Sequence, residues 1–275
     1  MRHFSPIIIF LFSFGFMQSG MAEVGDHNVQ EGKGLSSEKN QEVDPSHWGY
    51  RGVEGPDHWA MLNPSYNVCE TGRQQSPINI VMPRHGHDQE ELVFHYQPTP
   101  LSIRNNGHTI QVNYQGGSYL QLNGRSYKLR QFHFHDPSEH HIDGKVYPME
   151  MHLVHQDERG HLLVVGVLLE FGKENRVFSR VGDWMQHHTG SRLPSTGQEV
   201  STDLTFNLMD ILPQDTHHFS YHGSLTTPPC SEGVQWIVLK TPIAISKVQA
   251  DRFNATVGPN ARPVQSLEHR DVQEN

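Results

Sequence analysis

Short β-type runs separated by turn signals fill the chain between residues 92 and 129, and this pattern constrains the possible folds more than any other feature. The runs are rich in β-branched, aromatic and other apolar residues, and they cover residues 92–96, 101–104, 109–114, 118–122 and 126–129. Residues that favour tight turns lie between them, as Asn105-Asn-Gly107, Gln115-Gly-Gly117 and Asn123-Gly124. Two later runs, 162–170 and 236–239, are continuously apolar, which is typical of buried central strands. The sequence therefore predicts a mostly β fold, α+β in some classifications, with one large, mainly antiparallel twisted sheet.

Helical periodicity is sparse. It is present at about 176–187, at 202–212 and at 246–253, and the third segment begins with Ser246, a candidate N-cap. We expect these segments to form short helices at the periphery of the sheet.

The first 44 residues do not have the composition of a folded domain. Residues 1–22 combine a weakly basic start, an apolar run too short to cross a bilayer comfortably and small residues before Ala22, which is typical of a signal peptide. A retained amphipathic anchor is the alternative interpretation. Residues 23–44 are polar and predict a flexible leader, and residues 45–275 are enough for one domain. We therefore expect export to a periplasm, with secretion from the cell as the alternative, and no membrane anchor after cleavage.

Charge and cysteine content restrict the partners and the compartment. The formal net charge is −9, without a basic stripe, which argues against a nucleic-acid partner. Cys69 and Cys230 are the two cysteines, and an even number permits one disulfide in an oxidising compartment, although two separate buried thiols also fit the sequence. The residues do not distinguish a monomer from a homodimer.

A group of histidines carries the strongest chemical signal. In the segment Gln131-Phe-His-Phe-His135 the side chains of His133 and His135 share one face of an extended chain, because side chains alternate along a strand. A second β-type run, 149–154, carries His152. Any one of the 21 histidines, taken alone, is more often a surface or packed residue. Three neutral imidazoles on two strands, however, leave a fourth tetrahedral position open, which is the layout of a catalytic zinc site.

Two polar neighbours indicate how these imidazoles would be oriented. Gln131 lies on the same face as His133, and Glu150 lies on the same face as His152. Each could accept the N–H of its neighbouring histidine and so fix the tautomer and the ring orientation.

These motifs occur with others in the order found in one known family. The site motifs are His133-Phe-His135, Ser138-Glu-His140, Glu150-Met-His152 and Ser224-Leu-Thr-Thr-Pro-Pro229. Outside the site lie His47-Trp-Gly-Tyr50, Arg73-Gln-Gln-Ser-Pro-Ile-Asn79, Asn105-Asn-Gly-His108 and Asn260-Ala-Arg-Pro-Val-Gln265. Over about residues 45–270 the chain resembles the α-class carbonic anhydrases.

The resemblance implies a reaction and a cofactor. The reaction would be the reversible hydration of carbon dioxide to bicarbonate and a proton, through attack of a zinc-bound hydroxide. Zinc would be held by His133, His135 and His152. His108 would relay the proton to buffer, because histidine titrates near neutral pH.

The resemblance also implies roles for the residues around the metal. Thr226 would accept a hydrogen bond from the hydroxide and donate one to Glu139, which would not be a ligand. The cavity and its carbon dioxide pocket would be lined by Val154, Val164, Leu225, Trp236, Thr227 and Gln131. Cys69 and Cys230 match positions that form a disulfide in many exported members.

Two positions depart from the pattern of the animal enzymes. Asp136 stands where those enzymes usually have tryptophan, and His222 stands where a proline or a small residue is more common. Neither position is one of the implied metal ligands. We therefore expect activity to be retained, while the cavity rim and the inhibitor preference differ.

Two other classes of protein fit part of the sequence. His133-x-His135-x-x-x-Glu139 fits the first motif of a cupin-like metal oxygenase, in which the glutamate would be a ligand, but the second cupin motif is absent around His152. A non-catalytic zinc-binding or scavenging module is the other class, and it is disfavoured because His108 and Thr226 are both present. The sequence does not choose among carbon uptake, pH control and acid survival as the purpose of the reaction.

Overall fold

The structure is a computed structural model, and it describes residues 47–81, 83–85, 90–114 and 116–275. The predicted signal peptide 1–22 and the predicted leader 23–44 lie outside the described residues. No helix within the described residues is long and apolar enough to span a membrane.

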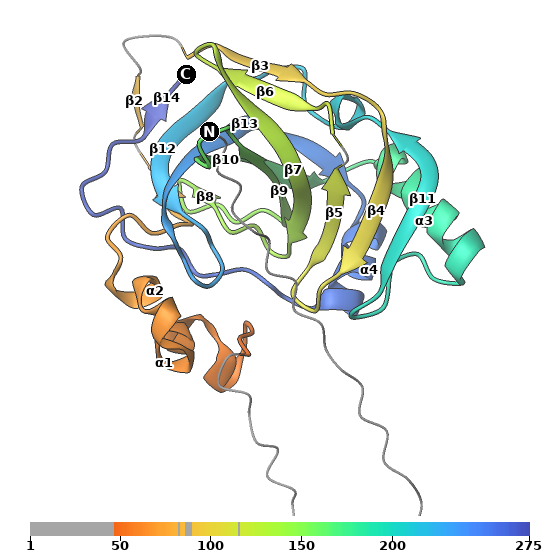
Figure 1. Cartoon of the computed structure of the whole chain (residues 1–275), viewed down its shortest axis with the longest axis horizontal. Helices are drawn as coiled ribbons and strands as arrows, with labels where there is room; N and C mark the ends of the chain where they lie inside the picture. The colour runs from red at the N-terminus through yellow and green to blue at the C-terminus, as the bar shows by residue number, and fades with distance from the viewer. Residues whose placement is uncertain (1–46, 82, 86–89, 115) are drawn as a thin grey trace, which may run out of the picture. The chain divides into compact units, whose positions relative to one another are not determined.

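A sheet of 12 strands dominates the described part of the chain (Figure 1). Its strands are β2 (Arg84–His85), β3 (Leu92–His95), β4 (Thr99–Asn105), β5 (Ile110–Tyr114), β6 (Tyr119–Leu122), β7 (Arg125–His135), β9 (Met149–Gln156), β10 (Leu162–Phe171), β11 (Glu199–Phe206), β12 (His218–Ser224), β13 (Glu232–Ile245) and β14 (Gln273–Glu274). They follow the order β11–β4–β5–β7–β9–β10–β13–β12–β14–β2, while β6 pairs with β7 and with β3. Among these described strands the pairs are antiparallel except β10–β13 and β14–β2. The prediction of a mostly β, mainly antiparallel fold is confirmed.

A small parallel sheet and short helical turns complete the architecture. The small sheet pairs β1 (Asn79–Ile80) with β8 (His141–Ile142). The short helical elements are η1 (Gly52–Glu54), η2 (Pro56–His58), α1 (Trp59–Leu62), η3 (Pro64–Tyr66), α2 (Val68–Thr71) and η4 (Leu208–Asp210).

The tight turn between β6 and β7 forms where its dipeptide predicted it. Asn123 and Gly124 adopt φ values of 50° and 76°. Positive φ at both central positions is what this type of hairpin turn requires, and Asn-Gly adopts it at low cost. The turn begins β7, the strand that carries two of the candidate ligands.

Two of the three predicted helices are present, and both have side-chain caps. Helix α3 (Arg176–Thr189) begins at Asn175, whose side chain accepts hydrogen bonds from two backbone N–H groups. Helix α4 (Lys247–Val257) begins with a capping box between Ser246 and Gln249, so the predicted cap is confirmed. Both helices lie near β4 and β11 (Figure 1).

The predicted helix at 202–212 is wrong. Residues 202–206 belong to β11, and only the three residues of η4 are helical. The run 199–206 alternates exposed or half-buried residues with the buried Thr202 and Phe206, and it pairs with β4. Edge pairing therefore outweighs a weak helical periodicity, because strand preference depends on the neighbouring strand and on the buried face.

Strand β7 separates two environments. Phe132 belongs to the main apolar cluster, and Phe134 packs against Phe178 of α3 and Phe253 of α4, with ring centroids 5.4 and 6.1 Å away. The alternate positions of the strand carry the histidines, which face the other way. One face of the strand therefore anchors the core, and the opposite face is left for the site.

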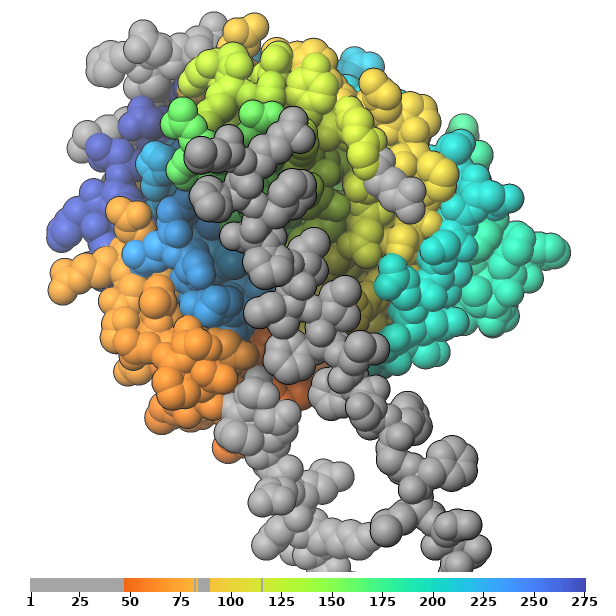
Figure 2. Space-filling view, in the orientation of Figure 1, coloured from red at the N-terminus to blue at the C-terminus, as the bar shows by residue number. Residues whose placement is uncertain are grey.

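The N-terminal helical turns lie beside β12 and the segment that follows it (Figures 1 and 2). A disulfide between Cys69 of α2 and Cys230 joins the two regions. The bond closes a sequence separation of 161 residues.

Candidate active site

Three imidazoles from two neighbouring strands form the centre of the site. His133 of β7 lies directly opposite His152 of β9 in the strand register, and His135 follows two residues after His133. One nitrogen from each ring lies within 4.8 Å of the others. The structure therefore brings together the three residues that the sequence singled out.

Two of the rings are oriented by the neighbours expected from the sequence. Nδ1 of His133 lies 2.8 Å from Oε1 of Gln131, and Nε2 of His152 lies 2.9 Å from Oε1 of Glu150. Because an amide oxygen and a carboxylate both accept, each of these ring nitrogens carries the proton. Nε2 of His133 and Nδ1 of His152 keep lone pairs that can bind a metal.

The third ring is oriented by a group that sequence reasoning missed. Nδ1 of His135 donates to the backbone carbonyl of Asn260, at 2.8 Å. The sequence does not indicate that a backbone carbonyl 125 residues away contacts His135. The motif that contains Asn260 was recognised, but no contact with the histidines was predicted from it. Nε2 of His135 is buried and has no hydrogen-bond partner among the described residues. A buried ring nitrogen without a partner is expected where a metal binds.

The electrostatics of the site keep all three rings neutral. Burial lowers the pKa of His133 well below its ordinary value, and it also lowers the pKa of His152. Burial lowers the pKa of His135 to about 4, against an opposing effect of its hydrogen bond to Asn260. Neutral imidazole is the form that binds a metal ion. Three neutral nitrogen donors with a fourth position open fit a zinc ion.

Glu150 receives donors on both of its oxygens. Its Oε2 accepts the backbone N–H groups of Glu139 and His140, at 2.9 and 2.8 Å. Burial alone would raise the pKa of Glu150, but His140 and His152 and their hydrogen bonds lower it well below its ordinary value. Glu150 is therefore a carboxylate that faces the outer nitrogen of a candidate ligand.

Glu139 is fully buried beside the three rings but is not a member of the metal-binding group. Its Oε1 accepts the backbone N–H of Arg262 at 2.8 Å, and its Oε2 lies 3.8 Å from Nδ1 of His152. Burial raises the pKa of Glu139 to about 7, while His152, the Thr226 hydroxyl and the Arg262 N–H each act to lower it. Because Glu139 does not belong to a group of described side chains that could hold a metal, the cupin-like arrangement, in which it would be a ligand, is disfavoured.

An apolar wall stands beside the rings. Val164 of β10 pairs with Val154 of β9 and with Trp236 of β13, and Leu225 packs against the same cluster. The Trp236 ring centroid is 4.9 Å from that of His152. The structure therefore places the predicted carbon dioxide pocket residues together, next to one candidate ligand.

His108 lies apart from the three rings, in the connection between β4 and β5. Its backbone N–H is held by the side chain of Asn106, and its ring stacks on Trp48 with centroids 3.8 Å apart. Burial lowers the pKa of His108, and the neighbouring His47 lowers it further. The imidazole is therefore neutral near pH 7 and can accept a proton. Sequence reasoning assigned no role to Trp48, which positions this ring.

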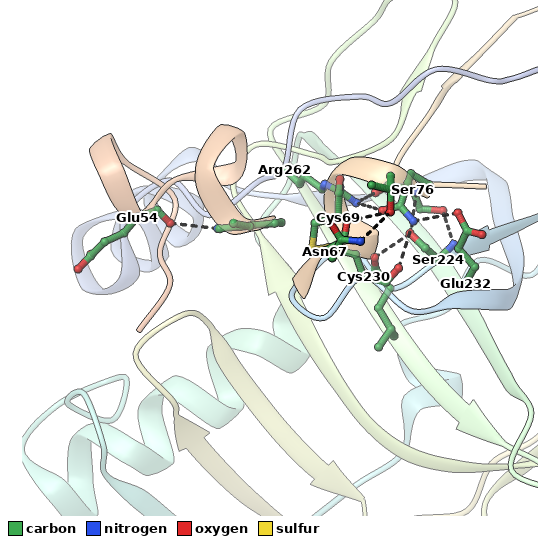
Figure 3. Close-up of a disulfide and its surroundings, with 12 residues drawn as sticks. Glu54, Asn67, Cys69, Ser76, Ser224, Cys230, Glu232 and Arg262 are labelled. Carbon is green, nitrogen blue, oxygen red and sulfur yellow. Dashed lines mark hydrogen bonds between the residues drawn. A yellow bond between two sulfur atoms is a disulfide. The ribbon is translucent and has the colours of Figure 1, made fainter. Parts of the chain in front are cut away.

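Arg262 lies beside the disulfide (Figure 3) and also contacts the site. Its guanidinium donates to the backbone carbonyls of Cys69 and Ser76, each at 2.8 Å, and its backbone N–H donates to Glu139. Gln75 donates to the carbonyl of Cys230. The disulfide and Glu139 thus belong to one buried network.

Comparisons with known proteins agree on one family. The model of the eukaryotic-type carbonic anhydrase family matches residues 54–275. A carbonic anhydrase of Nostoc sp. is 44% identical over 231 residues, which covers 82% of this chain and 85% of the relative. A carbonic anhydrase of Neisseria gonorrhoeae is also 44% identical over 231 residues, covering 83% of this chain and 88% of the relative. The structure of the α-carbonic anhydrase of Thermovibrio ammonificans with the inhibitor sulfanilamide is similar, with a TM-score of 0.77, 40% identity, and 82% and 98% of the two chains covered.

Proposed function

The chain belongs to the eukaryotic-type (alpha) carbonic anhydrase family, and on that premise we propose that it catalyses the zinc-dependent, reversible hydration of carbon dioxide to bicarbonate and a proton. The observation that carries the proposal is the group of three neutral imidazoles. One nitrogen from each ring lies within 4.8 Å of the other two, and the Nε2 atom of His135 is buried without a partner among the described residues.

The metal would be held by His133, His135 and His152. Zinc, when bound there, lowers the pKa of a coordinated water to roughly 7, a value known from carbonic anhydrase itself, and so supplies a nucleophile at neutral pH. The residues that surround the three ligands would orient the attacking oxygen, hold the carbon dioxide and remove the proton.

Thr226 would orient the attacking oxygen. It is buried, and its hydroxyl is one of the groups that lower the pKa of Glu139. If the hydroxyl donates its proton to that carboxylate, only its oxygen lone pairs remain free, so it accepts a hydrogen bond from the attacking oxygen. This one-way arrangement would turn a lone pair of the nucleophile toward carbon dioxide.

The apolar wall would hold the substrate. Carbon dioxide has no hydrogen to donate, and the side chains of Val154, Val164, Leu225 and Trp236 offer it contact without ordering water. The indole N–H of Trp236 is already used by the carbonyl of Ser224, at 2.9 Å. Thr227, which follows Thr226, would line the cavity beside this wall.

We expect His108→Ala to slow hydration in dilute buffer by roughly 100-fold, the low end of what a positioned proton-transfer group contributes. Zinc content should not change, because His108 is not one of the three ligands. Stopped-flow hydration across a series of buffer concentrations measures the effect, and added imidazole should restore part of the rate.

His188→Ala is a matched control. His188 also stacks on a tryptophan, Trp184, with centroids 4.1 Å apart, but it lies in the exposed last turn of α3. The control should behave as the unmodified protein. A His108→Ala protein that lost zinc in proportion to rate, or that kept the buffer dependence of the unmodified protein, would contradict the shuttle role.

Hydration and metal content measured on one sample test the proposed function. Protein that lacks residues 1–22 should contain about one zinc per chain and should hydrate carbon dioxide in a stopped-flow assay, with inhibition by a sulfonamide. Zinc without hydration would favour the non-catalytic binding module. Bound iron or manganese would favour the metal oxygenase.

The compartment and assembly are also proposals. We infer export through residues 1–22, and the disulfide between Cys69 and Cys230 supports an oxidising compartment such as a periplasm. The enzyme would act on carbon dioxide and bicarbonate in the periplasm, and we propose no nucleic-acid partner. It would be a monomer or a homodimer. Mass measured on the exported protein would show both the cleavage position near Ala22 and the oligomeric state.

A further inference from the structure

A chain of hydrogen bonds between buried side chains ends on the outer nitrogen of His152. From Nε2 of His152 it runs to Oε1 of Glu150 at 2.9 Å, and from the same oxygen to Nδ1 of His140 at 2.8 Å. It continues from Nε2 of His140 to the hydroxyl of Tyr221 at 2.7 Å, and from that hydroxyl to Oγ of Ser76 at 2.8 Å. All five side chains are buried. This series of hydrogen bonds therefore extends from a candidate metal ligand to the segment beside the disulfide.

The direction of each proton follows from the end at Glu150. The carboxylate can only accept, so His140 must carry its proton on Nδ1 and has a lone pair on Nε2. That lone pair needs a donor, and the Tyr221 hydroxyl is the group within reach. The Tyr221 oxygen can in turn accept from the hydroxyl of Ser76. Glu150 thus selects the tautomer of His140, and the Tyr221 hydroxyl supports that tautomer by donating to Nε2.

Two glycines leave the space in which this chain lies. Gly166 of β10 is opposite His152 in the strand register, and a Cβ atom there would be 2.7 Å from Oε1 of Glu150. At Gly223 of β12 a Cβ atom would be 2.1 Å from Oγ of Ser76. A side chain at either position would displace one of these hydrogen-bonded residues. The two glycines therefore leave room for the series of hydrogen bonds at two separate points.

We propose that Tyr221 is a positioning residue for the metal ligand His152. Its hydroxyl holds His140 in the tautomer that donates to Glu150, and this holds the carboxylate against the ring of His152. The inference rests on the proposed zinc site, and it goes beyond that site because it assigns a function to a side chain two hydrogen-bonded residues away from the ligand.

Removal of the Tyr221 hydroxyl would leave a buried acceptor on His140 without its donor. An unpaired buried polar group is costly, so the His140 ring would turn or shift to find another partner. Either movement withdraws a donor from Glu150. The carboxylate would then hold His152 less firmly, and the ligand would be less well placed for the metal.

The test compares Tyr221→Phe with a matched control, Tyr96→Phe. The Tyr96 hydroxyl also contacts a buried histidine of β9, Nε2 of His155, at 2.7 Å, but this pair does not reach the candidate ligands. Zinc dissociation into a chelator and the visible spectrum of the cobalt-substituted proteins are measured for both variants and for the unmodified protein. Metal-free melting temperatures report the structural cost of each substitution.

We expect zinc to leave Tyr221→Phe about tenfold faster than the unmodified protein, within the range seen when partners of metal ligands are replaced. The cobalt spectrum should change, whereas Tyr96→Phe should keep the dissociation rate and spectrum of the unmodified protein. Equal dissociation rates for the two variants would overturn the role of Tyr221. Absence of zinc from the unmodified protein would instead overturn the proposed function.

Ser76→Ala keeps the proposal testable if Tyr221→Phe does not fold. This variant leaves the Tyr221 hydroxyl in place and removes the Ser76 hydroxyl, which is the donor behind it and also accepts the backbone N–H of Ser224. We expect a smaller change in the same direction, about two- to threefold faster zinc loss. An unchanged rate in Ser76→Ala would contradict the proposed chain.

Discussion

Replacement of His135 by alanine is expected to weaken zinc binding so far that the metal is lost on dialysis against a chelator and, with it, carbon dioxide hydration. Zinc held by four ligands in small peptides is bound by roughly 10–16 kcal/mol, or about 3 kcal/mol per ligand, so one lost ligand weakens affinity on the order of 10²-fold or more. The Nε2 atom of His135 is buried without a partner among the described residues, so no other group there is shown to compensate. Metal analysis after dialysis and stopped-flow hydration measure the two losses.

His155→Ala is the control for this substitution. His155 is a fully buried histidine of β9 that contacts Tyr96 and the carbonyl of Leu163 and is not a member of the metal-binding group. Both variants create a cavity of similar size, so both should melt at a lower temperature without metal. Only His135→Ala should lose zinc. Full zinc content in His135→Ala would remove the basis of the proposed site.

Loss of the disulfide is expected to have the largest effect on stability. A cross-link over a separation of 161 residues restricts the unfolded chain, and in the loop-entropy account it contributes about 5 kcal/mol, against a typical measured range of roughly 2–5. We expect the double variant Cys69→Ala/Cys230→Ala to melt about 5–15 °C lower than the oxidised protein. Thermal unfolding followed by circular dichroism measures the difference.

Reduction of the unmodified protein provides the matched comparison. If the cross-link itself stabilises the fold, the reduced protein and the double variant should unfold at nearly the same temperature. A double variant much less stable than the reduced protein would show that the packing of Cys69 and Cys230 matters more. A double variant as stable as the oxidised protein would contradict the prediction.

Local sequence patterns predicted the features that depend on only a few neighbouring residues. The alternation around His133 showed which side chains share a face, because that depends only on the geometry of a single strand. The Asn123-Gly124 turn and the Ser246 cap are likewise local, since each depends on the backbone preference of a few residues. The helix expected at 202–212 failed because pairing with β4 decides that segment, and no window of the sequence contains that partner.

The site divides in the same way. The three histidines with Gln131 and Glu150 were apparent from spacing, and the roles of the other residues came from resemblance to a family. The sequence did not indicate three features of the folded protein. These are the hydrogen bond from His135 to the carbonyl of Asn260, the space that Gly166 leaves beside Glu150, and the contact of Tyr221 with His140.

The sequence by itself thus determined the β-rich fold class, the faces of the strands and the candidate ligands. Tertiary structure alone decided which distant groups hold those ligands. Strand periodicity acts over a few residues, whereas the hydrogen bonds that orient a buried imidazole join segments as far apart as His135 and Asn260, and they exist only when the folded chain brings both to the same place.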